Sequence, residues 1–229
     1  MTLTPKQKKI VAVAPIIILT YLAATLILYD LFLEPQINKI TGGAISKVNI
    51  SHPPPSYCNF SLYEGENLIS FHCMNGIYPI DFLLNNISQN YISIFSYFSQ
   101  DPTDPWKSYN PSLPTWTVQD LGWIYDEKGY WIIMNKNSSY FFEGTINMYP
   151  KVYLYKGWNL IGFTKETPAA IEDFLAGIDG HYNLVLQYKK ETDLWYYYSP
   201  DDNSSTLLMI EPNYGYWINM SQDDMLEYS

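Results

Sequence analysis

The sequence predicts a mainly β protein: two tandem, similar β-rich domains, each with one short helix, preceded by a single N-terminal transmembrane helix. Two observations support this fold class, an uncharged apolar run near the N-terminus and a set of phrases that recur in the same order. The phrases are GENLISF (65–71) and GWNLIGF (157–163), TDPWKSYNP (103–111) and TDLWYYYSP (192–200), and GYWIIM (129–134) and GYWINM (215–220). The second copies follow the first by 92, 89 and 86 residues (157 − 65, 192 − 103 and 215 − 129). Repetition in the same order at such similar spacings is typical of a duplicated structural module.

The apolar run IVAVAPIIILTYLAATLILY (10–29) contains no charged residue. As a helix it would be roughly 30 Å long, which is the thickness of a bilayer core. Three lysines precede the run and two acidic residues follow it. Because positive flanks stay in the cytoplasm, we expect a cytoplasmic tail over 1–9, a transmembrane helix over 10–32 and extracellular domains after it.

Two other interpretations of this N-terminus stay open. A cleaved signal peptide would have a shorter apolar core and an A-x-A-like cleavage site, and neither is present. A prepilin-like start would place Gly or Ala at the charged junction, whereas here Lys9 is followed directly by Ile10. The sequence therefore favours a retained membrane anchor.

Asn-x-Ser sequons follow the apolar run and agree with an extracellular location. The glycosylation candidates are Asn49, Asn59, Asn86, Asn137 and Asn203. A sixth sequon, at Asn219, lies within a predicted strand. The alternative is that these matches reflect only a chain rich in Asn and Ser.

The two cysteines, Cys58 and Cys73, suit an oxidising compartment. A two-residue turn at Gly65-Glu66 would make a hairpin in which Cys58 faces Cys73. We therefore predict a disulfide that closes this hairpin. The alternative is two buried free thiols.

Residues 33–56 have no lasting periodicity and contain Gly42-Gly43 and three consecutive prolines, which predicts a stalk or linker. We expect one repeat domain over 57–145 and another over 146–229. Each domain opens with a strand, a Gly turn and a second strand. A short helix follows, over 79–88 in the first domain, and with Thr167 as N-cap in the second.

Further strands are expected over 90–98 and 182–190, at the two W-x-x-Y-x-P segments and at the two GYWI segments. Alternation places Tyr130, Ile132 and Met134 on one face, and Tyr216, Ile218 and Met220 repeat them identically. We predict that this shared face is core. The other face, which differs at Ile133 and Asn219, should meet solvent or a neighbour.

Composition and motifs argue against several functions. The net charge is −10 and every cation is Lys, so nucleic-acid binding is not expected. Standard hydrolase, metalloprotease, redox and dinucleotide motifs are missing, and the three histidines stand apart from any paired base or nucleophile. The acidic pairs Asp201-Asp202 and Asp223-Asp224 lack calcium-ligand spacing. We expect no enzyme activity, no cofactor and no metal site.

The ordered motifs G-x-N-L-I, W-x-x-Y-x-P and G-Y-W-I resemble a tandem repeat domain of secreted and cell-surface proteins, especially archaeal ones, over roughly residues 57–229. In the first copy the matching residues are Gly65, Asn67, Leu68, Ile69, Trp106, Tyr109, Pro111, Gly129, Tyr130, Trp131 and Ile132. In the second they are Gly157, Trp158, Asn159, Leu160, Ile161, Trp195, Tyr198, Pro200, Gly215, Tyr216, Trp217 and Ile218. The first copy departs at Glu66, where the second has Trp158. The resemblance implies a modular, β-rich, anchored or surface-associated protein, and it implies no biochemical activity.

The 22 Tyr and 7 Trp are the most unusual feature of the composition. Exposed Tyr and Trp can anchor a protein interface or stack on sugars, although they can equally build the core and the contact between domains. We expect a structural or interaction protein of the cell envelope that acts by contact with other envelope proteins or surface glycans. The alternative is an extracytoplasmic carbohydrate- or polymer-binding module. The contact candidates differ between the repeats: Trp158, Tyr196, Tyr197 and Asn219.

Overall fold

The computed structural model describes residues 55–114 and 116–227. The predicted tail, the transmembrane helix over 10–32 and nearly all of the stalk lie outside these residues. Within the described ranges, neither α-helix has the length and apolar character that a membrane span requires.

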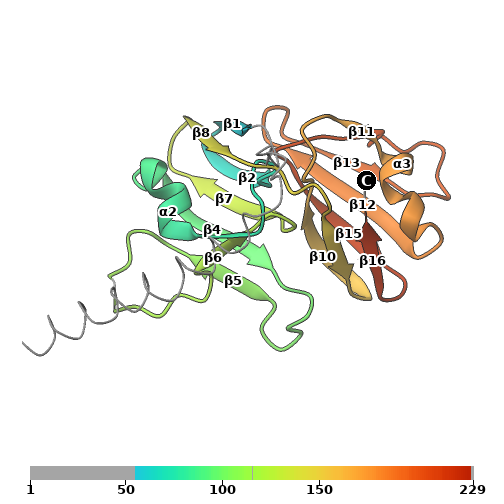
Figure 1. Ribbon diagram of the computed structural model, residues 1–229, viewed down its shortest axis with the longest axis horizontal. Helices are drawn as coiled ribbons and strands as arrows, with labels where there is room; N and C mark the ends of the chain where they lie inside the picture. Colours follow the sequence, from blue (N-terminus) through green and yellow to red (C-terminus); the bar gives the residue numbers. More distant parts are fainter. Residues whose placement is uncertain (1–54, 115, 228–229) are drawn as a thin grey trace, which may run out of the picture. The chain divides into compact units, whose positions relative to one another are not determined.

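The first repeat is built on a four-stranded antiparallel sheet with the strand order β2-β7-β4-β5 (Figure 1). Two short antiparallel pairs, β1 with β8 and β3 with β6, accompany this sheet, and helix α2 follows β3. A 3-10 turn, η1, continues α2. The bounds are β1 Ser56–Leu62, β2 Gly65–Ile69, β3 Ile77–Pro79, α2 Ile80–Leu84, η1 Asn85–Ile87, β4 Tyr91–Tyr97, β5 Trp106–Tyr109, β6 Trp123–Tyr125, β7 Tyr130–Met134 and β8 Ser138–Gly144.

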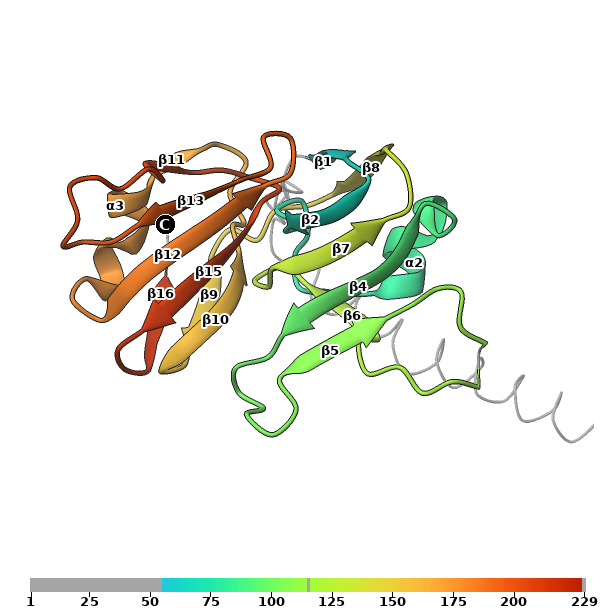
Figure 2. The same cartoon turned by 180° about the vertical axis from the view of Figure 1, so that it is seen from behind.

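The second repeat has the same architecture, with the strand order β10-β15-β12-β13 (Figure 2). The pairs β9 with β16 and β11 with β14 correspond to the two short pairs of the first repeat. The bounds are β9 Lys151–Leu154, β10 Gly157–Gly162, β11 Ala169–Ala170, α3 Ile171–Leu175, η2 Ala176–Ile178, β12 Tyr182–Lys189, β13 Leu194–Tyr198, β14 Met209–Ile210, β15 Gly215–Met220 and β16 Asp224–Glu227. The expected mainly β class with two short helices is therefore confirmed.

Each repeat has a hydrophobic core of its own on one face of its four-stranded sheet. The predicted core face of the GYWI strands is confirmed, because all six of its residues are buried: Tyr130, Ile132, Met134, Tyr216, Ile218 and Met220. Period-two alternation was sufficient here because one face of each strand lies against a core.

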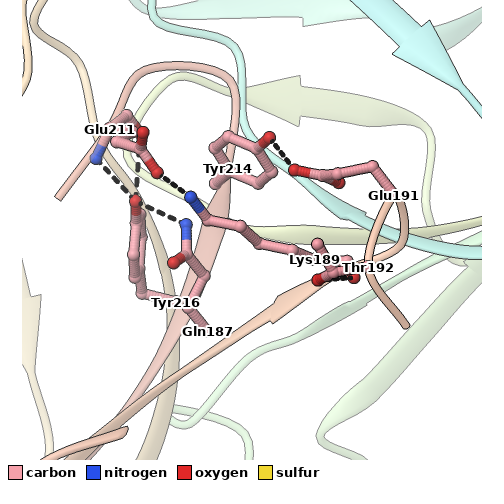
Figure 3. A network of polar contacts seen from close by, with 7 residues as sticks. All are labelled: Gln187, Lys189, Glu191, Thr192, Glu211, Tyr214 and Tyr216. Carbon is pink, nitrogen blue, oxygen red and sulfur yellow. Dashed lines mark hydrogen bonds and ion pairs between the residues drawn. The ribbon is translucent and has the colours of Figure 1, made fainter. Parts of the chain in front are cut away.

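The hydroxyl of the GYWI tyrosine closes a turn just before its strand. In the second repeat the Tyr216 hydroxyl accepts hydrogen bonds from the Glu211 N–H at 2.6 Å and from Gln187 Nε2 at 3.0 Å, and it donates to the Glu211 carbonyl at 3.1 Å (Figure 3). In the first repeat the Tyr130 hydroxyl binds the N–H and carbonyl of Tyr125 in the same way. Phe could not replace either tyrosine without leaving backbone groups unpaired.

The asparagine of G-x-N-L-I holds the turn that precedes it. Asn67 is buried; its Oδ1 accepts from the Tyr63 N–H at 2.9 Å, and its Nδ2 donates to the carbonyls of Tyr63 at 2.7 Å and Gly65 at 3.0 Å. Asn159 makes the corresponding three bonds with Tyr155 and Gly157. The glycine in each turn adopts a positive φ, 91° at Gly65 and 92° at Gly157, which favours glycine over other residues.

The expected hairpin across Gly65-Glu66 is wrong. Strand β1 pairs with β8 and strand β2 pairs with β7, so the glycine turn sends the chain from one sheet to another. The Cys58–Cys73 disulfide is nevertheless present, with the two Cα atoms 5.5 Å apart. It joins β1, of the β1-β8 pair, to the segment that follows β2 of the four-stranded sheet.

The predicted helix in the second repeat begins later than expected. Its apolar stripe is confirmed, since Ile171, Phe174, Leu175 and Ile178 are buried in α3 and η2. Thr167 is not the N-cap, because the cap is Ala170. The two residues before α3 pair with β14 as strand β11, and this pairing takes the place of a first helical turn.

Candidate interaction cleft between the repeats

The two four-stranded sheets meet through the faces that point away from their own cores. A third apolar cluster forms there, with Leu68, Leu160 and Tyr188 buried and with Tyr97, Trp131 and Trp217 packed against them. The contacting residues occupy equivalent positions in the two repeats. The sequence predicts that the face of the GYWI strands opposite the core meets solvent or a neighbour. In the structure this face lies against the other repeat.

The aromatic contacts across this junction are reciprocal. The ring centroid of Trp131 lies 5.6 Å from that of Tyr188 and 5.9 Å from that of Trp195. The ring centroid of Trp217, which holds the position of Trp131 in the second repeat, lies 5.3 Å from that of Tyr97 and 5.7 Å from that of Trp106. Aromatic pairs of this kind contribute about 1 kcal/mol each beyond their area burial.

The glycine of each GYWI motif allows the backbones of the two repeats to approach. A Cβ at Gly129 would lie 2.8 Å from the Ile161 carbonyl oxygen, and one at Gly215 would lie 2.9 Å from the Ile69 carbonyl oxygen. The adjacent backbones form reciprocal β-bridges, from Ile69 to Tyr214 and from Lys128 to Ile161. The G-Y-W-I motif therefore contributes to the junction through its glycine as well as to the core through its tyrosine.

An apolar cleft of about 360 Å³ opens at one end of the junction. It is lined by Tyr97, Trp106, Trp158, Leu186, Trp195 and Trp217. The rings of three of these residues are also open to solvent, with relative exposures of 45% at Trp106, 38% at Trp158 and 51% at Trp195. We call this feature the aromatic cleft. Its lining carries no charged side chain, and its polar groups are the Tyr97 hydroxyl and the indole N–H groups.

The rings around Trp217 stand at steep angles to one another. The interplanar angle with Trp217 is 90° for Trp158, 66° for Trp106 and 60° for Tyr97. The rings therefore form the walls of a hollow, whereas a flat sugar-stacking surface would need rings that lie nearly coplanar.

One sequence difference between the two repeats makes the junction asymmetric. Trp158 follows the glycine of the second G-x-N-L-I motif, and Glu66 follows that of the first. The charge of Glu66 acts on Tyr188, whose pKa is raised to about 12, first by burial and then by its hydrogen bond to Asp193. At the opposite end of the junction, the position equivalent to Trp158 is therefore occupied by the carboxylate of Glu66. The aromatic cleft has an indole at this position.

The four contact candidates lie in three different environments. Trp158 lines the cleft and is the cross-strand partner of Asn219, whose Oδ1 accepts from Asn183 Nδ2 at 2.9 Å. Tyr196 lies on the opposite, core-facing side of its sheet, with the Lys189 ammonium 5.6 Å from its ring centroid.

Tyr197 lies in β13 as the cross-strand partner of Leu186, and it is part of neither the core nor the cleft lining. Its hydroxyl donates to Asp202 Oδ2 at 3.0 Å and is 2.7 Å from Ser204 Oγ. The cleft therefore brings together Trp158 with residues that the sequence did not single out as contacts, namely Tyr97, Trp106, Leu186, Trp195 and Trp217. For Trp106, Trp195 and Trp217 the sequence signal is their place in the W-x-x-Y-x-P and GYWI motifs, where a tryptophan recurs in both repeats. Tyr97 and Leu186 lie outside these motifs.

Four of the five glycosylation candidates are exposed: Asn59, Asn86, Asn137 and Asn203. Asn49 lies outside the described residues. Asn137 has a structural contact as well, because its Oδ1 accepts from the Glu64 N–H at 2.8 Å.

The histidines and acids of the described residues form local contacts. His72 is buried beside the disulfide, with Nδ1 3.7 Å from Cys58 Sγ, and burial lowers its pKa. His181 Nδ1 lies 2.6 Å from Asp224 Oδ2, and this hydrogen bond lowers the pKa of Asp224. No group of three or more His, Cys, Asp or Glu side chains within 55–114 and 116–227 is arranged to hold a metal ion.

Comparison of the chain with known protein families, with curated proteins and with solved structures gives no match. The resemblance to tandem cell-surface repeats stays a prediction.

Proposed function

We propose that this protein is a membrane-anchored, extracytoplasmic structural or interaction protein of the cell envelope that acts by contact through its aromatic cleft. The N-terminal apolar run supports the anchor, and the sequons and the disulfide support the oxidising, extracellular side. The cleft is the observation that carries the proposal. It combines an uncharged lining with three half-exposed tryptophans, and Trp is strongly enriched among residues that dominate protein interfaces.

A partner protein would fill the cleft with an apolar side chain. Such a side chain would remove the three exposed indoles from water and would need no charged partner. Beside Trp106, Lys107 pairs with Asp101 at 3.0 Å and with Asp104 at 2.8 Å, so its ammonium is already engaged by carboxylates of its own chain. The expected ligand is therefore an apolar or aromatic group on an envelope protein.

A carbohydrate- or polymer-binding role is the second candidate, and the exposure of Trp106 and Trp195 favours it. Two features weigh against it. The rings are steeply inclined to one another, and the lining offers few hydrogen-bond groups to the hydroxyls of a sugar. The protein-contact function is therefore the better supported of the two.

The two functions can be separated with cell envelopes from the producing organism. Full-length protein in detergent would be titrated onto untreated envelopes, protease-treated envelopes and periodate-oxidised envelopes. We expect protease to abolish binding and periodate to leave it intact. Loss of binding after periodate, with retention after protease, would overturn the proposal in favour of a glycan ligand.

A further inference from the structure

The connection between β5 and β6 presents three apolar side chains to solvent: Leu113, Trp116 and Val118. We call these three residues the apolar tip. Trp116 is 83% exposed and Val118 is 95% exposed, so neither makes much contact with its own chain. An indole held in water at this exposure is unusual for a residue with so much apolar surface.

The base of this connection is fixed by hydrogen bonds. The Ser108 N–H donates to Asp120 Oδ1 at 2.7 Å, and the Asn110 N–H donates to Gln119 Oε1. Nearer the tip, the Thr117 N–H donates to the Pro114 carbonyl at 2.8 Å. A connection restrained in this way loses less conformational entropy on binding than a free loop would.

The corresponding connection of the second repeat, residues 199–208, has no tryptophan, and its exposed large apolar residue is Leu208. Its connection after β13 contains a polar turn in which Asp202 accepts from the Ser204 N–H at 2.8 Å and from the Ser205 N–H at 3.2 Å. Trp116 is therefore specific to the first repeat, as Trp158 is specific to the second. Neither tryptophan belongs to the set of residues that the two repeats have in common.

The tip and the cleft lie at opposite ends of β5. Trp106, which lines the cleft, is the first residue of this strand, and the connection that carries the tip leaves from its last residue, Tyr109. The high exposure of Trp116 agrees with this separation. In one copy of the chain, an apolar projection and an apolar hollow are thus both open to solvent.

We propose that the apolar tip of one copy of this chain inserts Trp116 into the aromatic cleft of a second copy. The inference rests on the proposed function, since it names the partner of the same cleft. A cleft of about 360 Å³ has room for one indole, and its inclined walls would enclose the ring on several sides. Because the contact joins two different surfaces, each copy keeps a free tip or a free cleft, and the copies assemble head to tail.

Charge favours these two surfaces over the rest of the molecule. The chain carries a net charge of −10, so two copies repel each other over most approaches. The six cleft residues and the three tip residues are uncharged. Association through them should therefore strengthen as salt screens the remaining repulsion.

Cysteine cross-linking of the full-length chain in detergent tests this contact. The two natural cysteines are bonded to each other, so Thr117→Cys and Lys156→Cys variants each carry one free thiol, near Trp116 and Trp158 respectively in the chain. The two variants, with different tags, would be mixed and treated with a short bismaleimide. We expect a mixed dimer at roughly ten times the yield of either homodimer.

A second substitution supplies the control. Trp116→Ala in the Thr117→Cys chain should lower the mixed yield about tenfold, whereas Trp123→Ala should not, because Trp123 is exposed on β6 and does not line the cleft. Equal yields for mixed and homotypic pairs, or no effect of Trp116→Ala, would overturn the inference. Quenching of Trp116 fluorescence by brominated phosphatidylcholine, without a mixed dimer, would show a membrane-contacting tip and would also overturn it.

Envelope binding separates this inference from the proposed function. If the mixed dimer is absent while Trp158→Ala still weakens binding to envelopes, self-association is wrong and the contact function stands. If Trp158→Ala changes neither the mixed dimer nor envelope binding, both proposals fail.

Discussion

Trp131 and Trp217 hold the same position in the two repeats, and each packs against two aromatic side chains of the other repeat. Both tryptophans lie on the face of a GYWI strand that points away from the core of their own repeat. The repeated motif therefore has two structural roles: its tyrosine packs in the core, and its tryptophan packs in the junction. The aromatic cleft lies at the end of this junction that carries Trp158, and the first repeat has Glu66 at the equivalent position.

Gly129→Ala should destabilise the protein by about 2 kcal/mol, since the new methyl group would collide with the Ile161 carbonyl across the junction. Gly122→Ala is a matched control, because nothing lies within 4 Å of its added Cβ. Denaturant unfolding of both variants provides the measurement. A Gly129→Ala variant as stable as Gly122→Ala would mean that the backbones of the repeats do not approach as described.

Reduction of the Cys58–Cys73 disulfide should cost about 3 kcal/mol, because the bond closes a loop of 15 residues in the unfolded chain. The loss should be largest in the first repeat, where the bond joins β1 to the segment after β2. Thermal unfolding with and without reductant would measure it. Two thiols that alkylate in the native, unreduced protein would contradict the bonded pair.

Stability should fall as pH rises through the neutral range, in part because of Glu127. Burial, aided by a hydrogen bond with Asp126, raises the pKa of Glu127 from its ordinary 4.5 to about 7. The folded chain therefore binds this proton more tightly than the unfolded chain does. Its contribution is full below about pH 4.5 and is lost as the pH passes about 7.

Glu127→Gln should flatten this part of the pH dependence. The measurement is the difference in unfolding free energy between the variant and the natural chain, followed from about pH 5 to about pH 8. Taking the difference removes the opposite contribution of His72, whose pKa is lowered by burial. A constant difference across this range would show that Glu127 titrates alike in both states.

Alternation and motif order predicted the strands that form the centre of each repeat. The core faces at Tyr130 and Tyr216 followed from period-two patterns, because those patterns depend only on local geometry. Strand partners were harder to predict. The turn at Gly65 is a hairpin signal, yet β1 pairs with β8, about eighty residues away in the chain, and no local pattern reports such a pairing.

The candidate cleft was predictable only in part. Trp158 was singled out because it differs between the repeats, and it lines the cleft. Trp106 and Trp195 are not among the predicted contact residues, because those were chosen for differing between the repeats and these two recur. Their rings nevertheless remain half exposed, because they lie at the edge of the junction, where the other repeat covers only one side of each ring. Tyr196 was expected at the contact surface, but its strand register turns it toward the core side with Gln187.

The most direct test of the account measures unfolding free energy and envelope binding on the same preparations of Trp158→Ala and Trp131→Ala, with Trp123→Ala as an exposed control. Trp158→Ala should keep its stability within about 1 kcal/mol and lose at least about 2 kcal/mol of binding. Trp131→Ala should lose about 3 kcal/mol of stability, because it removes two ring contacts across the junction. If Trp158→Ala unfolds the protein, or binds envelopes as tightly as Trp123→Ala does, the separation of contact residues from scaffold residues is contradicted.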